Sequence, residues 1–206
     1  MRFTAIARDV PLTAEHDVDA EAVLARIDTK QRIRGMFVLP IVQLLTPSAK
    51  AAVLATLDER PRGGTFLPFL GYSRRDYLRI VLAAADAGDP ALSRAQRIRA
   101  IARNDFVTFS ESLLGRTIRA AVSTTTAAIL KTPSVYDAVA PAPGARISAR
   151  ALADGRLELR YERYPLLWPY HLGQLEGMAV AFGNHTVTDV DVDVDSDAVV
   201  YVTAVS

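Results

Sequence analysis

The chain of 206 residues has no cysteine, and its only histidines are His16, His171 and His185. Disulfides, thiol catalysis and cysteine-ligated zinc are therefore excluded, and little imidazole is available for metal chemistry. No apolar run approaches the roughly 20 residues that a membrane-spanning helix needs. The first eleven residues also lack the apolar run of about 7 to 15 residues found in signal peptides. We therefore expect a cytoplasmic protein with no membrane span.

The chain also has almost no net charge, because 24 Lys and Arg residues are balanced by 23 Asp and Glu residues, which leaves a formal charge of +1. Such a balance gives no electrostatic drive toward nucleic acid. The most basic patch has no aromatic residues between its arginines, so we expect a solvated helix face and no nucleic-acid partner. Its arginines are Arg94, Arg97, Arg99 and Arg103.

The length predicts a single domain over residues 1–206. Residues 1–140 read as a mainly helical lobe, and residues 141–206 as an antiparallel sheet lobe. Between them, two prolines in the stretch 140–144 are typical of a linker. The predicted fold class is α+β, in which an N-terminal helical lobe packs on a C-terminal twisted antiparallel sheet with one inserted helix.

Several helix boundaries can be predicted from capping residues and apolar spacing. Thr46 and Ser73 are suited to cap the helices that follow them. Residues 30–45 read as one helix that Pro40 bends or breaks, because proline removes a backbone donor. Residues 93–103 and 105–114 read as two separate helices. The run of hydroxyl residues 123–126 predicts a kink or a helix boundary.

The C-terminal lobe changes to an alternating pattern. Asp154-Gly155 predicts a hairpin between two strands, and residues 157, 159 and 161 form the apolar face of the second. A Pro- and aromatic-rich corner (164–170) leads to a helix (171–182), in which Gly173 and Gly177 leave a flat strip for close packing. A closing hairpin carries alternating acidic residues that favour a wet strand face over a calcium loop. These are Asp189, Asp191, Asp193, Asp195 and Asp197.

This C-terminal order resembles a Myxococcales paralogous family of uncharacterised proteins. The resemblance rests on the strand pattern Leu-x-Leu-x-Tyr-x-Arg, the corner, Gly-Gln-Leu-Glu-Gly, and Phe-Gly-Asn before a valine-rich hairpin. The stretches 33–37 and 72–78 are also similar to that family. More distantly, the order looks like that of haem-nitric-oxide-binding, vinyl-reductase-like and vesicle-tethering-subunit domains. The distant resemblance implies helices before an antiparallel sheet, with haem, a small apolar ligand, an acyl chain or nothing between them.

Haem can be tested against the residues that this resemblance implies. Haem-binding members use a helical histidine as axial ligand and a Tyr-x-Ser-x-Arg motif. Tyr161 matches the first position of the motif, but Arg163 and Pro165 replace its serine and arginine. The helices from Ser73 to Val139 contain no histidine. We therefore expect no cofactor, and we expect haem to be absent.

The candidate ligand-binding residues cluster around the corner. Amphipathic rings beside a cation are typical of a pocket mouth or a binding surface, and they are equally typical of a packed corner between sheet and helix. His171, which opens the helix, is either a contact to a ligand, a base or a structural hydrogen-bond partner. The candidate site consists of Tyr161, Arg163, Tyr164, Trp168, Tyr170 and His171. No catalytic or metal-ligating residue is predicted.

Three functional hypotheses follow. The favoured one is a non-catalytic regulatory or sensory module that binds a small apolar ligand or a protein partner between the helical lobe and the sheet. The second is an enzyme acting on a hydrophobic substrate, with His171 as base and Arg163 as anion clamp. The third is a structural homodimerisation domain held together through its helices. The sequence does not identify the ligand, the partner or the oligomeric state.

Overall fold

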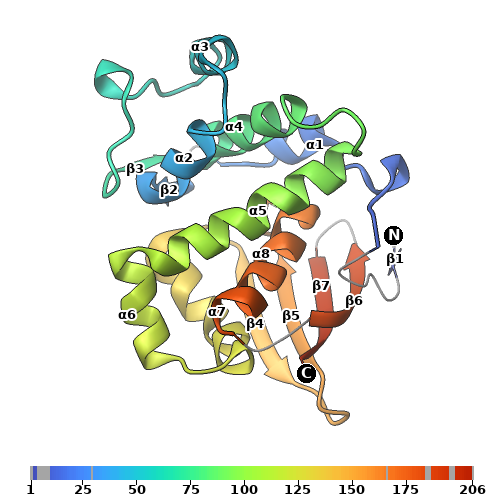
Figure 1. Ribbon diagram of the computed structural model, residues 1–206. Coiled ribbons are helices and arrows are strands. Elements are labelled where there is room, and N and C mark those ends of the chain that lie inside the picture. Colours follow the sequence, from blue (N-terminus) through green and yellow to red (C-terminus); the bar gives the residue numbers. More distant parts are fainter. Residues whose placement is uncertain are drawn as a thin grey trace.

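The computed structural model describes residues 2–3, 10–28, 30–165, 167–183, 187–194 and 198–205. It confirms the α+β class, with helices that precede an antiparallel sheet and one helix inserted between strands of that sheet. Helix α5 crosses the middle of the molecule (Figure 1). Helices α2 and α4 lie on one side of it, and helices α6, α7 and α8 and the sheet lie on the other.

The larger sheet has five antiparallel strands in the order β1-β6-β7-β5-β4, so its central strand comes from the C-terminus of the chain. The β4–β5 hairpin turns at Asp154-Gly155 as predicted, and Gly155 has a φ of 83°. Leu157, Leu159 and Tyr161 are buried on the face of β5 that meets the helices. The strands are β1 (Arg2–Phe3), β4 (Arg146–Ala151), β5 (Leu157–Glu162), β6 (Val187–Val194) and β7 (Ala198–Val205).

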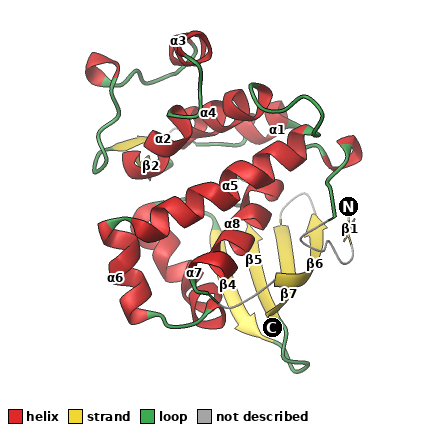
Figure 2. Ribbon diagram, in the orientation of Figure 1, coloured by secondary structure: helices red, strands yellow, loops and turns green. Residues whose placement is uncertain are grey.

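Eight α-helices and two short 3-10 helices occupy the rest of the described chain (Figure 2). The α-helices are α1 (Ala20–Ala25), α2 (Gly35–Val42), α3 (Pro47–Ala55), α4 (Arg74–Asp86), α5 (Arg94–Glu111), α6 (Leu113–Ala121), α7 (Thr125–Val139) and α8 (Trp168–Ala181). The 3-10 helices are η1 (Ala14–His16) and η2 (Arg62–Gly64). Among the described residues, no helix combines the length and the hydropathy needed to cross a bilayer.

Side-chain caps fix the beginnings of several helices. Thr46 accepts a hydrogen bond from the Ala49 amide at the start of α3, and Ser73 accepts one from the Asp76 amide at the start of α4. Both caps were predicted. Thr124 caps α7 in the same way, which confirms a boundary within the hydroxyl-rich run. Each such cap is worth about 1 kcal/mol of stability.

Two predicted helix boundaries are wrong. Residues 30–45 do not form one helix, because residues 32–34 form strand β2 (Arg32–Arg34), which pairs with β3 (Gly71–Ser73) in a second small sheet. The partner strand lies 39 residues away from β2 in sequence, so local spacing could not reveal it. Residues 93–103 and 105–114 are not separate, since α5 continues through Asp105 to Glu111. The buried face of α5 continues from Ala102 through Asp105 to Ser110, so the helix has no boundary there.

Helices α5 and α8 pack closely through the glycine strip that the sequence predicted. A Cβ added to Gly173 would lie 2.1 Å from the Arg99 carbonyl oxygen, and one on Gly177 would lie 2.7 Å from Phe106 Cβ. Arg99, predicted on a solvated face, is in fact buried in this contact. It pairs with Glu176 of α8 through Nε at 2.9 Å. Only glycine lets the two backbones approach this closely.

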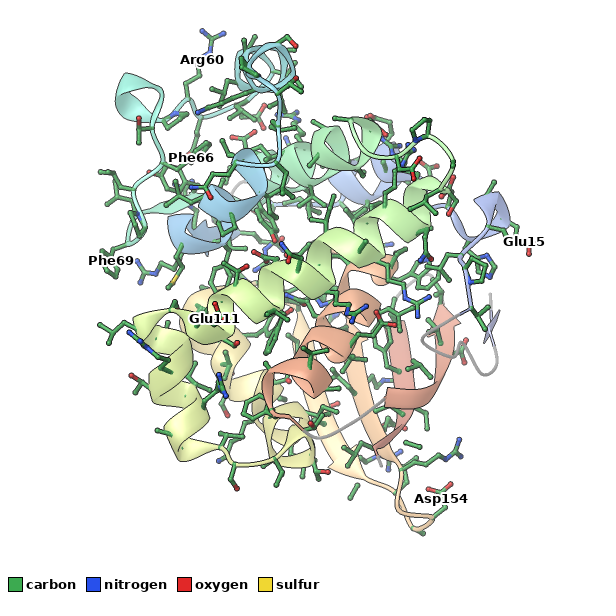
Figure 3. All side chains as sticks on the ribbon, in the orientation of Figure 1. Glu15, Arg60, Phe66, Phe69, Glu111 and Asp154 are labelled. Atoms are coloured by element: carbon green, nitrogen blue, oxygen red, sulfur yellow. The ribbon has the colours of Figure 1, made fainter. Side chains whose placement is uncertain are left out.

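The apolar loop between α3 and β3 is divided between core and surface. Phe66 is buried against Tyr72, with ring centroids 4.8 Å apart. Phe69 is 79% exposed, and Figure 3 shows it at the margin of the molecule, apart from Phe66. The Gly63-Gly64 pair makes a turn with positive φ at both residues, a conformation that glycine adopts readily.

Candidate ligand-binding site

A cavity of about 100 Å³ lies between the two groups of helices. It is bounded by α2, α4, α5, α6, α7, α8 and the corner that follows β5. Most of its wall is apolar, including Phe37, Leu78, Phe106, Phe109, Val135 and Met178. A water molecule needs roughly 10 to 15 Å³ measured in this way. The cavity therefore has room for several water-sized groups, and it is smaller than an engineered apolar cavity of about 150 Å³ that binds benzene.

The candidate residues separate into three groups. Tyr164, Tyr170 and His171 line the cavity. Tyr161 and Trp168 do not, because both are buried in the core between α8 and the sheet. Arg163 is exposed, with a φ of 50°, at the turn after β5. Half of the candidate cluster is thus a packed corner and a turn, while the other half faces the cavity.

The cavity also lies elsewhere than expected. The hypothesis placed a ligand between helices and sheet, above Tyr161 and Trp168. Those side chains are closely packed, and no described residue that lines the cavity belongs to the five-stranded sheet. The buried rings of Tyr161 on β5, Trp168 on α8 and Tyr201 on β7 fill the space that the hypothesis left for a ligand. The cavity lies among the helices and not against the five-stranded sheet.

A chain of three side chains crosses one wall of the cavity. The Tyr77 hydroxyl of α4 donates to the Tyr170 hydroxyl of α8 at 2.5 Å, and Tyr170 donates to Asp105 Oδ2 of α5 at 2.6 Å. Burial raises the pKa of Asp105 to about 7, and the Tyr170 hydrogen bond opposes this shift. Desolvation favours the neutral acid here because no described cation pairs with the carboxylate.

Arg74 supplies the buried positive charge of the site. It is the first residue of α4, and it is only 4% exposed. Its guanidinium lies 4.5 Å from the centre of the Tyr164 ring, and its NH2 group donates to the Ala140 carbonyl oxygen at the end of α7. Arg74 therefore connects α4, α7 and the corner. Its aromatic contact is a cation–π interaction.

His171 is held as a neutral imidazole. Burial, together with the charge of Arg74, lowers the pKa of His171 to about 3. The Tyr136 hydroxyl of α7 donates to Gln174 Oε1 at 2.5 Å and lies 3.0 Å from His171 Nδ1. Because a hydroxyl has one proton, we assign the imidazole proton to Nδ1, which donates to Tyr136. Nε2 then keeps its lone pair, as a metal ligand would require.

Arg74, Asp105 and Tyr136 were missed as site residues, although the sequence contains a signal for two of them. Arg74 occupies the apolar stripe of α4, three, four and seven residues before Tyr77, Leu78 and Val81. Asp105 occupies the stripe of α5, between Ala102 and Phe109. A charged residue at a stripe position is a buried charge, and buried charges mark functional sites. Tyr136 offers no such signal, since tyrosine is ordinary on a buried face.

The family comparison covers most of the chain. Residues 26–203 match the model of a family described as a protein of unknown function, DUF2378. The chain belongs to the DUF2378 family. The predicted membership of an uncharacterised family is confirmed. No curated protein matches the chain.

Solved H-NOX structures share the fold of this DUF2378 chain. An H-NOX protein from S. oneidensis in the Fe(II)NO ligation state is 14% identical, with a TM-score of 0.64 over 84% of this chain and 99% of that one. The unliganded Fe(II) H-NOX protein from K. algicida is 11% identical, with a TM-score of 0.62 over 84% and 97%. A structure that probes heme distortion in the H-NOX family is 16% identical, with a TM-score of 0.59 over 84% and 91%. These likenesses confirm the predicted fold relationship.

The expectation of no cofactor, with haem absent, is contradicted by these comparisons. The structures that share the fold are of iron- and haem-containing H-NOX proteins. The expectation failed because it looked for histidine only on the helices from Ser73 to Val139. The fold instead brings His171 of α8 to the cavity wall. Among the described residues, no group of three or more His, Asp or Glu side chains is placed to hold a bare metal ion.

The side chains at the cavity fit haem in their chemistry. A neutral imidazole, a thioether and tyrosine are all axial ligands used by haem proteins, and His171, Met178 and Tyr136 present these groups. Arg74 offers a guanidinium to a carboxylate. A macrocycle is larger than the present volume of about 100 Å³, so its entry would require the surrounding helices to separate.

Proposed function

We propose that the protein is a non-catalytic sensory module that binds a small, mainly apolar ligand in the helical cavity. The observation that carries the proposal is the cavity itself, an apolar space between helices from both halves of the chain with few polar groups on its wall. Ligand pockets generally have this composition. The H-NOX fold supports the same function, since proteins with this fold hold a ligated iron.

A sensor must convert occupancy into a change of shape, and the cavity wall offers a route. Arg74 joins the start of α4 to the end of α7, while Tyr77 and Tyr170 join α4 to α8. A ligand that displaces either link changes how α4 sits against the C-terminal helices. The signal is then a shift between two arrangements of α4, driven by the ligand's different affinity for each. A surface that includes α4 would transmit it to a partner.

Haem is a candidate for this ligand. It would supply an iron centre able to bind a small gas molecule, as in the Fe(II)NO form of the S. oneidensis H-NOX protein. In this chain, His171 would hold the iron through Nε2, with Tyr136 and Gln174 fixing the imidazole orientation. The apolar wall would exclude water, and Arg74 would receive a carboxylate of the cofactor.

The test is native mass spectrometry of the protein purified from its own host. We expect a small molecule to co-purify with the wild type. Ala128→Phe, which fills the cavity from α7, should lose it. Ala127→Phe is the matched control, because it makes the same change on the same helix outside the cavity lining. Recovery of the bare chain from the wild type, under conditions that preserve complexes, would contradict the proposal.

An absorption spectrum of the same samples, before and after addition of hemin, decides whether the ligand is haem. A Soret band that shifts in His171→Ala identifies haem and shows that His171 would hold its iron. A co-purifying molecule without a Soret band identifies a ligand of another class in the same cavity. The Ala127→Phe protein again serves as the control, and its spectrum should match that of the wild type.

A further inference from the structure

Two polar atoms in the cavity wall have no hydrogen-bond partner among the described residues. They are Arg74 Nε and Asp105 Oδ1. Other arginines also have a buried Nε atom without a partner, but their side chains reach solvent, as Arg75 and Arg94 do at 27% and 32% exposure. Arg74 and Asp105 are almost fully buried. A buried polar atom without a partner costs about 1 to 3 kcal/mol.

The charge of Arg74 is the larger anomaly. Its contacts are the Ala140 carbonyl oxygen and the Tyr164 ring, and neither carries a formal charge. No carboxylate of the described residues lies within ion-pair distance of it. Asp105 lines the same cavity, but its bonded oxygen engages Tyr170. A buried cation without a counter-ion costs several kcal/mol. The chain keeps that cation beside an apolar space, where a ligand could neutralise it.

We propose that the ligand of this cavity is an apolar molecule with a carboxylate group, which pairs with Arg74. The inference rests on the proposed function and adds the charge of the ligand. A carboxylate suits the site because its two oxygens match the planar donors of a guanidinium. Asp105 Oδ1 gives a second polar contact, for a hydroxyl or amine elsewhere on the ligand.

Hexanoate and hexan-1-ol test the carboxylate directly. The two molecules have the same chain length, so the charged carboxylate group is what distinguishes them. Isothermal titration calorimetry of the wild type should show hexanoate binding roughly tenfold or more tightly, because a charge-assisted bond adds about 1.5 to 3 kcal/mol. This comparison requires no mutation, so it stands even if a variant fails to fold.

Substitutions then assign the preference to Arg74. Arg74→Gln should reduce hexanoate affinity to that of hexan-1-ol, and Arg74→Lys should restore part of the difference. Arg75→Gln is the matched control, since it removes the adjacent, partly exposed arginine of the same helix turn, and it should keep the full preference. Hemin added to the same variants separates the two sources of a carboxylate. Loss of hemin binding together with hexanoate binding in Arg74→Gln points to the propionates of haem, and loss of hexanoate binding alone points to a free carboxylic acid.

Three results separate this inference from the proposed function. Equal binding of hexanoate and hexan-1-ol, both lost in Ala128→Phe, would overturn the inference and leave the proposed function standing. A preference for hexanoate that survives in folded Arg74→Gln would also overturn the inference. If hexanoate, hexan-1-ol and hemin all fail to bind the wild type, both the inference and the proposed function are wrong.

Discussion

The chain buries two arginines, Arg99 and Arg74, at 2% and 4% exposure, and it treats them in opposite ways. Arg99 lies in the contact between α5 and α8, where Glu176 supplies a carboxylate and the Val10 carbonyl oxygen accepts a further bond at 2.8 Å. Arg74 lies beside the cavity, with a carbonyl oxygen and an aromatic ring as its contacts. One charge is neutralised by the chain, and the other is not.

The packing around the two arginines differs in the same sense. Around Arg99, the glycines of α8 bring two helix backbones together until no side chain would fit between them. Around Arg74, the helices stay apart and leave about 100 Å³. A chain able to close one helix contact so tightly has the means to close the other. The helices beside Arg74 therefore stay apart in a chain that packs other helices tightly, and the close α5–α8 contact lies next to the cavity.

The largest expected effect comes from breaking the ion pair between Arg99 and Glu176 in the α5–α8 contact. Glu176→Gln leaves Arg99 buried without its counter-ion, so we expect a loss of about 3 to 5 kcal/mol in the free energy of unfolding. Arg74→Met should change the stability of the ligand-free protein by about 1 kcal/mol or less. Removal of an uncompensated charge offsets the lost bond to Ala140 and the lost contact with Tyr164. Urea denaturation of both variants measures the difference.

The comparison breaks down if the two variants lose equal stability. A loss of several kcal/mol in Arg74→Met would mean that the chain itself compensates the charge of Arg74. The matched control is Arg75→Met, which removes a neighbouring arginine whose side chain reaches solvent. It should differ little from the wild type.

The next effect is the dependence of stability on pH, which involves two titratable groups of the cavity wall, Asp105 and His171. Asp105 has a folded pKa of about 7, above its ordinary 3.8, so its contribution to stability is lost as the pH rises from about 4 to 7. His171 has a folded pKa of about 3, below its ordinary 6.5, so its contribution is lost as the pH falls from about 6.5 to 3. Between pH 4 and 6.5 the two slopes oppose one another.

Asp105→Asn separates the two contributions. It removes the loss of stability with rising pH that Asp105 causes, and it keeps a side-chain oxygen that accepts from Tyr170. Relative to the wild type, its free energy of unfolding should rise by about 1.4 kcal/mol per pH unit between pH 4 and 6.5. Urea denaturation at several pH values measures the slope, and Asp137→Asn on the exposed face of α7 controls for the loss of a carboxylate. Parallel curves for Asp105→Asn and the wild type would show that Asp105 is not held neutral.

The sequence predicted the parts of this comparison unequally. The glycine strip, the β4–β5 hairpin and the helix caps depend on residues near one another in sequence, and they were predicted correctly. The β2–β3 pair and the position of the cavity depend on contacts between distant segments, and spacing along the chain contains no information on them. For that reason the sequence did not show that Tyr161 and Trp168 lie in the core and outside the cavity lining. The sequence left two interpretations open for the aromatic residues of the corner, a binding surface and a packed corner, and Tyr161 and Trp168 are packed in the core.

The charged residues of the site are a different case, because they could have been found. Arg74 and Asp105 each occupy an apolar stripe position, and a search for charges at such positions would have selected both. Arg99 would have been selected too, since it lies four residues after Ala95 and three before Ala102. The sequence could not separate the paired arginine from the unpaired one. That distinction depends on Glu176, which lies 77 residues from Arg99.

The smallest expected effect tests the difference in packing. Gly173→Ala puts a Cβ 2.1 Å from the Arg99 carbonyl oxygen, a backbone atom that cannot turn aside, so the helices must separate. We expect a loss of about 1 to 3 kcal/mol, typical of overpacking. Ala128→Val adds carbon on the open side, where space exists, and should change stability by less than about 0.5 kcal/mol. Thermal unfolding measures both. If Ala128→Val costs as much as Gly173→Ala, the two contacts are equally tight, and the open side holds no space for a ligand.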